Sequence, residues 1–454
     1  MGNKIDQSEP IILLGAGLAG SLMALYLAKR GFKVEVYERR PDMRKTDLYA
    51  GKSINLAISV RGLHAMQEVG LLDQVMDMCI PMRGRMVHDT NRKTQFQPYS
   101  KDGETAINSI SRGELNMLLM NAADAYDNLN LHFNYRCLGI DTRTGAVRLR
   151  NENTGEKISV RGQTAIATDG AFSGIRSSLM RTPRFNFSQT YHTHAYKELS
   201  FPAAANQGWL VEKNALHIWP RGNFMLIALP NLDGSFTVTL FYPRKGAGSF
   251  EELETPAAAE AFFQKEFPDA LELIPNFREE FFNNPTADLV TVKCSPWSYQ
   301  DKCVLMGDAA HAVVPFYGQG MNAAFEDCTV LNDCLNSHGN GDWDDLFQAY
   351  EARRIANGHA IAELAIEHYI EMRDSTGDTA WLFRKAIEHR LERTFPEYIS
   401  EYEMVSFTRI PYAEAQRRGR INEEILHELA KGINSPEQID LVLAKALIAE
   451  KLPQ

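Results

Sequence analysis

Strand-length apolar runs alternate along the chain with longer stretches of helical spacing. An apolar run stands at residues 11–14 and a second strand-like segment at 33–37, and apolar positions recur every three or four residues over the segment 19–30 between them. A further run, at residues 303–306, again precedes a glycine-rich turn and a helical pattern. Strands that alternate with helices in this way predict an α/β domain of the Rossmann-like kind.

A second pattern, of strands separated by turn residues, occupies the middle of the chain. Strand-like segments at 224–231 and 235–243 are followed by the turn signals NLDG and PRKGAG, and a helical pattern comes after them at 257–267. Beyond residue 342 the sequence becomes helical and charged. We expect a discontinuous Rossmann-like domain (1–76, 102–181 and 288–341), an inserted β-sheet domain (77–101 and 182–287) and a C-terminal helical region (342–454).

The composition favours a compact enzyme that acts on small molecules. A chain of 454 residues with a net charge of -10 is large enough for more than one core and ill suited to grip nucleic acid or anionic lipid. Its six cysteines are scattered and lack partner histidines at zinc spacing, so we expect reduced thiols and no metal site. The polar N-terminus, the charged C-terminal tail and the lack of an apolar run of about 18 residues predict a cytoplasmic protein without a membrane span.

The first glycine-rich turn has the spacing of a dinucleotide-binding site. Gly15, Gly17 and Gly20 form G-x-G-x-x-G between the first apolar run and the first helical stretch. The first glycine allows the tight turn, the second lets a pyrophosphate approach the helix N-terminus, and the third lets the helix pack closely. Glu38 ends the second strand, where a carboxylate accepts hydrogen bonds from a ribose hydroxyl. This unit suits either NAD or FAD, and the later motifs decide between them.

Two later strand-to-helix turns carry acidic residues that suit a flavin. Asp169 follows an apolar strand and precedes a helix, a pattern that a simple helix cap explains equally well. Asp308 follows the strand at 303–306, and its carboxylate can accept hydrogen bonds from the ribityl hydroxyls of a flavin. The amides of residues 320–322 begin the next helix, whose dipole favours negative charge on the pyrimidine end of a reduced flavin ring.

The order of the motifs GAGLAG, ATDGAFSGIR and MGDAAHAVVPFYGQGMN resembles that of the group A flavoprotein monooxygenases, the aromatic hydroxylases of the para-hydroxybenzoate hydroxylase type. The resemblance covers most of the chain and implies FAD on the Rossmann-like domain, with the substrate on the inserted sheet. It also implies a flavin contact from an arginine before a helix, and Arg112 stands at the matching place. The expected cofactor-binding residues are Gly15, Gly17, Leu18, Ala19, Gly20, Glu38, Arg39, Arg112, Asp169, Asp308, Gly320, Met321 and Asn322.

Longer blocks resemble one subgroup of this family, which hydroxylates L-kynurenine to 3-hydroxykynurenine. They include KSINLAISVRG, PMRGRMVH, LHIWPRGNFMLIALPN, YIEMRD and EMVSFTRIPYAEA. The resemblance implies that Arg85, Tyr99 and Tyr402 hold the carboxylate of the amino-acid substrate. Without it, Arg85 is typical of a solvated face and Tyr99 of a packed strand end. His368 departs from the subgroup, which usually has a substrate-contacting asparagine there, although histidine can still donate a hydrogen bond.

The reaction that the resemblance implies consumes NADPH and O2. NADPH reduces FAD, O2 adds to give a C4a-hydroperoxyflavin, and its distal oxygen passes to the aromatic ring. The substrate's own amino group activates the ring, so we expect no catalytic residue from the protein, whose role is positioning and exclusion of water. Pro315, Phe316 and Gln319 are expected to shape the pocket beside the flavin, and His311 to be a packed or flavin-adjacent structural histidine. A single dinucleotide motif implies a transient NADPH site.

Other functions remain compatible with the flavin motifs. The chain could hydroxylate another aromatic substrate, or it could be a flavin reductase or dehydrogenase that transfers no oxygen. A non-enzymatic FAD-binding module is disfavoured, because the blocks around Arg85 and Tyr99 would then have no reason to match a substrate site.

Overall fold

The computed structural model describes residues 4–45, 55–99, 103, 105–205, 207–338, 341–372 and 379–452. Contacts divide the chain into two compact units. The first comprises Met1–Cys79, Ile110–Tyr191 and Val290–Glu363, and the second Ile80–Ser109, His192–Leu289 and Leu364–Gln454. Strands and helices mix as the sequence predicts, with a helical C-terminal region, so the α/β fold class is confirmed. The finer domain boundaries stay a prediction, and the one expected at residues 101–102 lies outside the described residues.

A six-stranded sheet forms the centre of the first unit. Its order is β18-β19-β12-β1-β2-β8, and β1 pairs in parallel with both β12 and β2. Every residue of β1 is buried, as in parallel sheets that helices cover on both faces, which explains its unbroken apolar run. The strands are β1 (Ile11–Leu14), β2 (Val34–Glu38), β8 (Leu129–Phe133), β12 (Thr164–Ala167), β18 (Ser298–Tyr299) and β19 (Cys303–Leu305).

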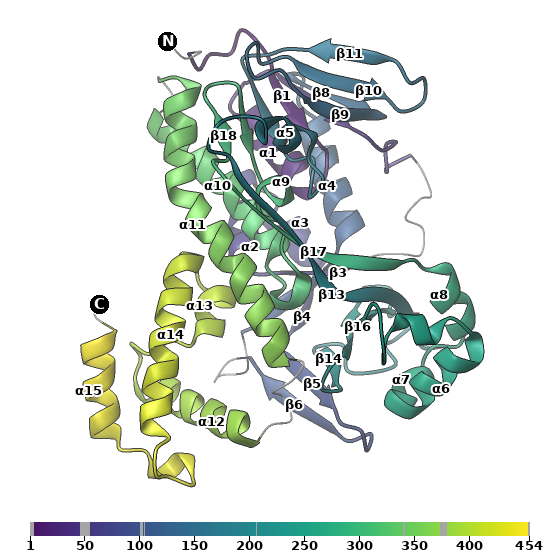
Figure 1. Cartoon of the computed structure of the whole chain (residues 1–454), viewed down its shortest axis with the longest axis vertical. Helices are drawn as coiled ribbons and strands as arrows, with labels where there is room; N and C mark the ends of the chain where they lie inside the picture. The colour runs from purple at the N-terminus through teal and green to yellow at the C-terminus, as the bar shows by residue number, and fades with distance from the viewer. Residues whose placement is uncertain are drawn as a thin grey trace. The chain divides into compact units, whose positions relative to one another are not determined.

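Helix α1 lies inside the core of the first unit, where it packs against α4 and α10 (Figure 1). Its residues 20–28 are all buried, so this helix is apolar on every side. Strand β3 (Asn55–Ile58) belongs to the same unit. The helices are α1 (Leu18–Lys29), α2 (Val60–Val69), α3 (Leu72–Asp77), α4 (Arg112–Asp124), α5 (Gly174–Leu179), α9 (Asp308–His311), the 3-10 turn η3 (Pro315–Tyr317), α10 (Gly320–His338) and the first part of α11 (Trp343–Ile370).

The first unit also contains a three-stranded antiparallel sheet that we did not predict from the sequence. Its order is β11-β10-β9, formed by β9 (Tyr135–Ile140), β10 (Val147–Asn151) and β11 (Lys157–Val160). Val147 and Leu149 of β10 are buried, whereas Arg148 between them is exposed. This alternation marks a half-buried strand, but it lasts for few residues and is easily missed.

A seven-stranded sheet forms the centre of the second unit. Its order is β17-β13-β16-β15-β14-β5-β6, and it confirms the strands expected in the middle of the chain. Strand β5 pairs in parallel with β14 and antiparallel with β6, which places Arg85 within the sheet. The strands are β5 (Gly84–His88), β6 (Thr94–Pro98), β13 (Asn186–Phe201), β14 (Leu216–Pro220), β15 (Met225–Pro230), β16 (Phe236–Pro243) and β17 (Thr286–Ser295). Separately, β4 (Ile80–Met82) pairs antiparallel with β7 (Ile107–Ser111).

Short helices pack on this sheet through aromatic side chains. Phe263, Phe267 and Phe277 share one buried cluster with Trp219 and Phe236 of the sheet. In Figure 1, α6, α7 and α8 lie together beside the strands of this unit. The elements are η2 (Phe250–Leu253), α6 (Pro256–Glu266), α7 (Pro268–Leu271) and α8 (Phe277–Asn283).

The C-terminal helices have a core of their own. Ile387, Leu391, Ile425, Leu429 and Ile448 belong to one buried cluster. Among the described residues, none of the helices combines the length and apolar character needed to cross a membrane. The helices are α12 (Thr379–Thr394), α13 (Glu401–Phe407), α14 (Tyr412–Leu429), the 3-10 turn η5 (Pro436–Gln438) and α15 (Leu441–Lys451).

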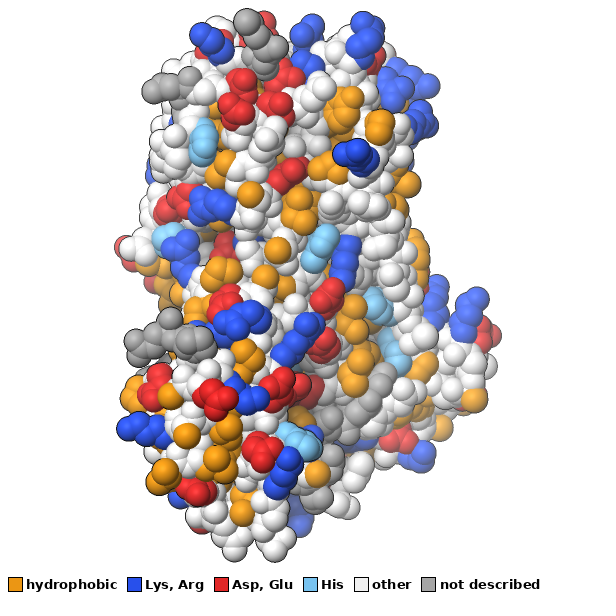
Figure 2. Space-filling view, turned by 60° about the vertical axis from the view of Figure 1, so that its left-hand side comes forward, with side chains coloured by type: hydrophobic (Ala, Val, Ile, Leu, Met, Phe, Trp, Pro, Cys, Tyr) orange, Lys and Arg blue, Asp and Glu red, His pale blue; other side chains and the backbone are white. Residues whose placement is uncertain are grey.

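Acidic and basic side chains are interspersed on the molecular face that Figure 2 shows, with hydrophobic side chains scattered between them. This mixture accompanies a net charge of -10. A surface of mixed charge suits an enzyme whose substrates are small molecules better than one that follows a polyanion.

Candidate active site

The glycine turn between β1 and α1 has the conformation that its sequence predicts. Gly15 has φ +97, and a Cβ there would lie 2.6 Å from the carbonyl oxygen of Thr168. A Cβ on Gly20 would lie 1.8 Å from the carbonyl oxygen of Gly15, so this contact between helix and turn requires glycine. A Cβ on Gly17, by contrast, would have no atom of the described residues within 4 Å. That space stands directly before the N-terminus of α1, where a pyrophosphate binds in such turns.

Glu38 at the end of β2 fastens the same turn. Its carboxylate accepts hydrogen bonds from the backbone N–H of Ala16 at 2.9 Å and from the backbone N–H and Nε of Arg40, each at 2.9 Å. The carboxylate is buried, whereas Arg39 is exposed. Glu38 therefore positions the glycine turn. Its remaining lone pairs can still accept the hydrogen bonds predicted from a ribose hydroxyl.

Asp169, after β12, has one satisfied and one unsatisfied carboxylate oxygen. Oδ2 accepts from the backbone N–H of Gly174 at 2.8 Å, which is the helix cap that the sequence allows. Oδ1 is buried and has no hydrogen-bond partner within the described parts of the chain. Burial raises the pKa of Asp169. A buried oxygen without a partner is costly, so a ligand that donates a hydrogen bond would stabilise it.

Asp308 begins α9 directly after Gly307, whose φ is +58. Water reaches the Asp308 side chain even though protein atoms surround it, and this crowding raises the pKa of its carboxyl group. The nearby side chains of Arg112 and His311 oppose that shift in the pKa. Arg112 is the exposed first residue of α4. Asp308 and Arg112 are thus close enough to interact electrostatically, although the sequence separates them by almost two hundred positions.

Helix α10 begins at Gly320, and its first backbone N–H groups have no acceptor within the helix. Asn322 is buried, and its side chain is used within the protein. Its Oδ1 accepts from the backbone N–H of Ser59 at 2.9 Å, and its Nδ2 donates to the carbonyl oxygens of Ala57 and Gly318. The side chain of Asn322 therefore anchors the helix start, which leaves the backbone amides as the groups that can face a flavin.

The loop before α10 contains the three residues expected to shape the pocket. Pro315 is exposed, whereas Phe316 and Gln319 are buried. Gln319 donates through Nε2 to Oγ of Ser59 at 3.3 Å. Both Gln319 and Asn322 thus connect this loop to the segment before α2.

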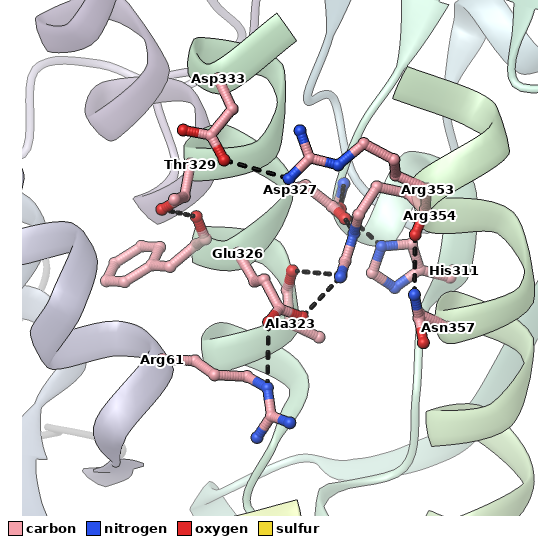
Figure 3. A network of polar contacts seen from close by, with 12 residues as sticks. Arg61, His311, Ala323, Glu326, Asp327, Thr329, Asp333, Arg353, Arg354 and Asn357 are labelled. Atoms are coloured by element: carbon pink, nitrogen blue, oxygen red, sulfur yellow. Dashed lines mark hydrogen bonds and ion pairs between the residues drawn. The ribbon is translucent and has the colours of Figure 1, made fainter. Parts of the chain in front are cut away.

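Behind this loop lies a buried ionic network that the sequence did not predict (Figure 3). Asp327 of α10 accepts from the backbone N–H of Gly307 at 2.9 Å, from Nε of Arg354 at 2.7 Å and from Nε2 of His311 at 2.5 Å. Trp297 stacks on the His311 ring, with centroids 5.0 Å apart. His311 is therefore a packed structural histidine, as expected. The network holds the backbone of the turn that presents Asp308.

Arg354 extends the network to α2. Its Nη1 donates to Glu326, whose other carboxylate oxygen accepts from Nε of Arg61 at 3.1 Å. All three side chains are buried, and Figure 3 shows the two arginines on opposite sides of Glu326. Asp327 lies shortly after the quoted third motif, but Arg354 lies on the next helix, where local sequence gives no sign of the partnership.

The predicted residues of the first unit fit FAD. Gly17 leaves room at a helix N-terminus, Asp169 offers an unpartnered buried oxygen, and Asp308 presents a solvent-accessible carboxylate. These features match a diphosphate and hydroxyl donors, which are the polar groups of this dinucleotide. Leu18 and Ala19 lie half-buried in the first turn of α1.

In the second unit, Arg85, Tyr99, Tyr402 and His368 form one cluster. The guanidinium of Arg85 lies 4.9 Å from the ring centroid of Tyr402 and 5.6 Å from that of Tyr99. The two tyrosine rings stack, with centroids 5.5 Å apart and an interplanar angle of 23°. Nη2 of Arg85 lies 3.0 Å from Nε2 of His368. Four residues from distant parts of the sequence thus meet at one place.

The cluster contains polar atoms that lack partners. Nε of Arg85 and the hydroxyl of Tyr99 are buried and make no hydrogen bond to any described residue. Burial alone would lower the pKa of Arg85, but the nearby groups of Tyr402, Tyr99 and Glu371 raise it, so this arginine stays charged. Burial raises the pKa of Tyr99, so its hydroxyl keeps its proton. Two donors without acceptors beside a fixed positive charge suit a carboxylate ligand.

Glu371 completes the cluster and was missed in the sequence. It lies three residues after His368, and its Oε2 is 3.0 Å from Nδ1 of that histidine. Its Oε1 accepts from Nε1 of Trp381 at 3.0 Å and lies 3.4 Å from Nζ of Lys385. The helical spacing of His368 and Glu371 was available as a signal. No comparable signal pointed to Trp381 and Lys385 on α12, because the sequence between them and Glu371 does not continue the helical pattern.

Comparison with known proteins bears on both sites. A family profile described as "FAD binding domain" matches residues 9–365. The chain is 48% identical over 447 residues to a kynurenine 3-monooxygenase of Myxococcus xanthus, with 98% of this chain and 96% of that protein covered. The chain belongs to the kynurenine 3-monooxygenase family. A member of this family from Dictyostelium discoideum is 44% identical over 459 residues, which cover 98% of both chains.

A solved structure shares the fold of this family member. The tetrameric form of 2-methyl-3-hydroxypyridine-5-carboxylic acid oxygenase matches it with a TM-score of 0.67 and 19% identity, over 83% of this chain and 96% of the other. At that identity the similarity concerns the fold alone. The matching profile and the family together identify the chain as an FAD-dependent monooxygenase.

Proposed function

We propose that this protein hydroxylates L-kynurenine to 3-hydroxykynurenine, with NADPH and O2 as co-substrates and FAD as the bound cofactor. The observation that carries the proposal is the pair of buried, unpartnered donors at Arg85 and Tyr99, found in a chain that belongs to the kynurenine 3-monooxygenase family. An amino acid supplies the carboxylate that such donors require.

Arg85 is the main carboxylate ligand in this proposal. Its guanidinium can form a charge-assisted hydrogen bond through Nε, while Tyr99 adds a hydrogen bond through its hydroxyl. Tyr402 lies under the guanidinium and limits its movement, because the ring occupies one face of the planar group. A site built from charge and fixed planes favours a carboxylate over a neutral group.

When bound, FAD supplies the activation of O2, and the residues of this chain supply position and environment. Asp169, Asp308 and the first amides of α10 would hold the dinucleotide. The buried loop residues Phe316 and Gln319 would exclude water from its surroundings, which favours oxygen transfer over release of hydrogen peroxide. The amino group on the substrate ring directs attack to the neighbouring carbon, so the protein needs no strong base. NADPH would bind transiently, since one dinucleotide turn serves FAD.

The direct test is an aerobic assay with purified protein, NADPH and L-kynurenine. NADPH consumed, 3-hydroxykynurenine formed and hydrogen peroxide released are measured together. The proposal expects hydroxylated product in nearly one-to-one ratio with NADPH. Peroxide without product would instead indicate a hydroxylase for another aromatic substrate. NADPH oxidation in the absence of O2, with an organic acceptor reduced and no oxygen transferred, would indicate a flavin reductase or dehydrogenase.

A further inference from the structure

His368 lies between the substrate arginine and a fixed carboxylate. Its Nε2 is 3.0 Å from Nη2 of Arg85, and its Nδ1 is 3.0 Å from Oε2 of Glu371. The histidine is 6% exposed, and its ring lies 5.6 Å from that of Tyr402. The position that usually holds asparagine in the subgroup is thus occupied by a residue that bridges two charged groups.

The partners of His368 fix where its proton resides. A guanidinium only donates hydrogen bonds, so Nε2 of His368 must accept from Arg85. Nδ1 therefore carries the proton of the neutral ring and donates it to Glu371. Trp381 and Lys385 hold the other oxygen of that carboxylate, so Glu371 is anchored from α12 as well. The arrangement requires an uncharged histidine in a single tautomer.

We infer that His368 is a positioning residue, which acts on the substrate through Arg85. By accepting the hydrogen bond from Nη2, it holds the guanidinium so that Nε and the rest of its edge remain available to the substrate carboxylate. This inference rests on the proposed function, since it assigns a role within the same site. A protonated His368 could not accept that hydrogen bond, so Arg85 would lose its support when the ring becomes charged.

Burial keeps the ring of His368 neutral at pH 7, while the charges that face it act in opposite directions. Within the described residues these groups are Arg85 from β5, Lys385 from α12, Tyr402 from α13 and Glu371 at the end of its own helix. Burial lowers the pKa of His368 below its ordinary value of 6.5, and the charges of Arg85 and Lys385 lower it further, while Glu371 opposes them. Affinity for the substrate should therefore stay constant at pH values above the lowered pKa of His368, and it should fall as the solution becomes more acidic.

The test compares two substitutions in the FAD-loaded enzyme. His368→Gln keeps an acceptor that reaches Arg85 but cannot titrate, whereas His368→Phe keeps the ring shape without an acceptor. Affinity for L-kynurenine is measured by titration of the flavin absorbance from pH 5 to pH 8. At pH 8 we expect His368→Phe to weaken affinity about tenfold, as for loss of a hydrogen bond to a charged group, with a smaller change in kcat. His368→Gln should bind nearly as well as the natural protein at pH 8 and should lose the decline at acid pH.

The chain offers a matched control. His389 lies three residues before Glu392 on α12, with Nδ1 3.1 Å from Oε2, and its side chain is 57% exposed. His389→Phe and His389→Gln remove the same kind of helical histidine–glutamate pair away from Arg85, and both should bind L-kynurenine normally. FAD content and melting temperature are recorded for every variant, so that a folding defect in His368→Phe is recognised and His368→Gln then carries the test.

A substrate analogue separates action through Arg85 from direct contact. The decarboxylated amine of L-kynurenine lacks the group that Arg85 binds, so its affinity should be unchanged in His368→Phe. Equal weakening for both ligands would mean that His368 touches the substrate itself, and an unchanged affinity for L-kynurenine, or an acid decline retained by His368→Gln, would overturn the inference. If the natural protein fails to bind L-kynurenine at all, the proposed function is wrong instead.

Discussion

At the scale of single residues, Arg85 and Tyr99 show how a binding site differs from a structural cluster. In the network around Asp327, the donors meet acceptors of the protein itself. In the cluster around Arg85, two buried donors remain without a described partner. Buried polar groups are normally hydrogen-bonded, so unmatched donors indicate where a ligand completes the structure.

Replacing Arg85 by Ala tests this reading. Loss of a buried, charge-bearing donor should weaken binding of L-kynurenine by about 2 to 3 kcal/mol, roughly 30- to 160-fold. FAD content should be unchanged, because Arg85 lies in the second unit and the FAD residues in the first. Arg92→Ala is the control, since that arginine follows β5 on the same hairpin and pairs with Glu272 at an exposed position. An enzyme that lost FAD and kept its substrate affinity would contradict the assignment.

Two glycines of the first turn allow a second comparison at this scale. Gly17→Ala adds a methyl group where the described residues leave space, so the FAD-free protein should keep its melting temperature while FAD affinity falls. Gly20→Ala places a methyl group 1.8 Å from the carbonyl oxygen of Gly15, so the protein itself should be destabilised. Thermal unfolding of the FAD-free proteins and fluorescence titration with FAD distinguish the two effects. Equal destabilisation by both substitutions would remove the argument for a ligand beside Gly17.

At the scale of elements, the sequence allowed prediction of features that depend on neighbouring residues, but not of contacts between distant segments. The apolar run of β1, the glycine turn and the start of α10 could be read directly, because each depends on neighbouring residues. The sheet of β9, β10 and β11 was missed, since its strands are short and partly exposed. The partnership of Asp327 with Arg354 was missed too, because it joins two helices whose register the sequence does not reveal.

Helix α10 provides a prediction at this scale. Asp327→Asn should cost about 3 kcal/mol of unfolding free energy, because it leaves the buried charge of Arg354 without its full partner. FAD affinity should also fall, since Asp327 holds the backbone N–H of Gly307 next to Asp308. Asp333→Asn on the same helix is the control. Figure 3 shows the ion pair of Asp333 with Arg353. This pair is half-exposed and should contribute at most about 1 kcal/mol to the unfolding free energy. Equal losses of unfolding free energy in urea for the two variants would show that the buried network contributes no more to stability than a half-exposed ion pair.

The same aspartate predicts a pH dependence. Burial alone would raise the pKa of Asp327, but His311 and Arg354 hold it below the ordinary value of 3.8. A carboxylate with a depressed folded-state pKa contributes stability that is present above its unfolded-state pKa and is lost as the pH falls through the lower folded-state value. Acid unfolding of the natural protein should therefore be steeper below about pH 4 than that of Asp327→Asn. Parallel curves for the two proteins would contradict this.

At the scale of the whole molecule, the site residues divide between the two units. The expected FAD residues belong to the first and the carboxylate cluster to the second. The sequence could indicate both groups because each lies in a block shared with the family, whereas the anchoring of Glu371 by Trp381 and Lys385 depends on the fold of α12. Because the cofactor residues and the substrate residues belong to different units, we expect FAD and L-kynurenine to affect stability separately.

Removal of FAD tests that separation. A ligand that binds the folded state at one hundred times its Kd adds about 2.7 kcal/mol of stability, so FAD-free protein should melt at a lower temperature and recover on addition of FAD. L-kynurenine should raise the melting temperature further in the natural protein and not in Arg85→Ala. Differential scanning calorimetry measures both shifts. An FAD-free protein that melts at the same temperature as the FAD-loaded protein would contradict the cofactor assignment.

Transfer of an oxygen atom from O2 to L-kynurenine defines the proposed activity, and isotopically labelled O2 shows whether it takes place. The purified, FAD-loaded protein is supplied with NADPH and L-kynurenine under labelled O2, and the product is analysed by mass spectrometry. We expect 3-hydroxykynurenine that carries one labelled oxygen atom for each NADPH oxidised. NADPH oxidation with all of the label in hydrogen peroxide, or a hydroxylated product without label, would contradict it.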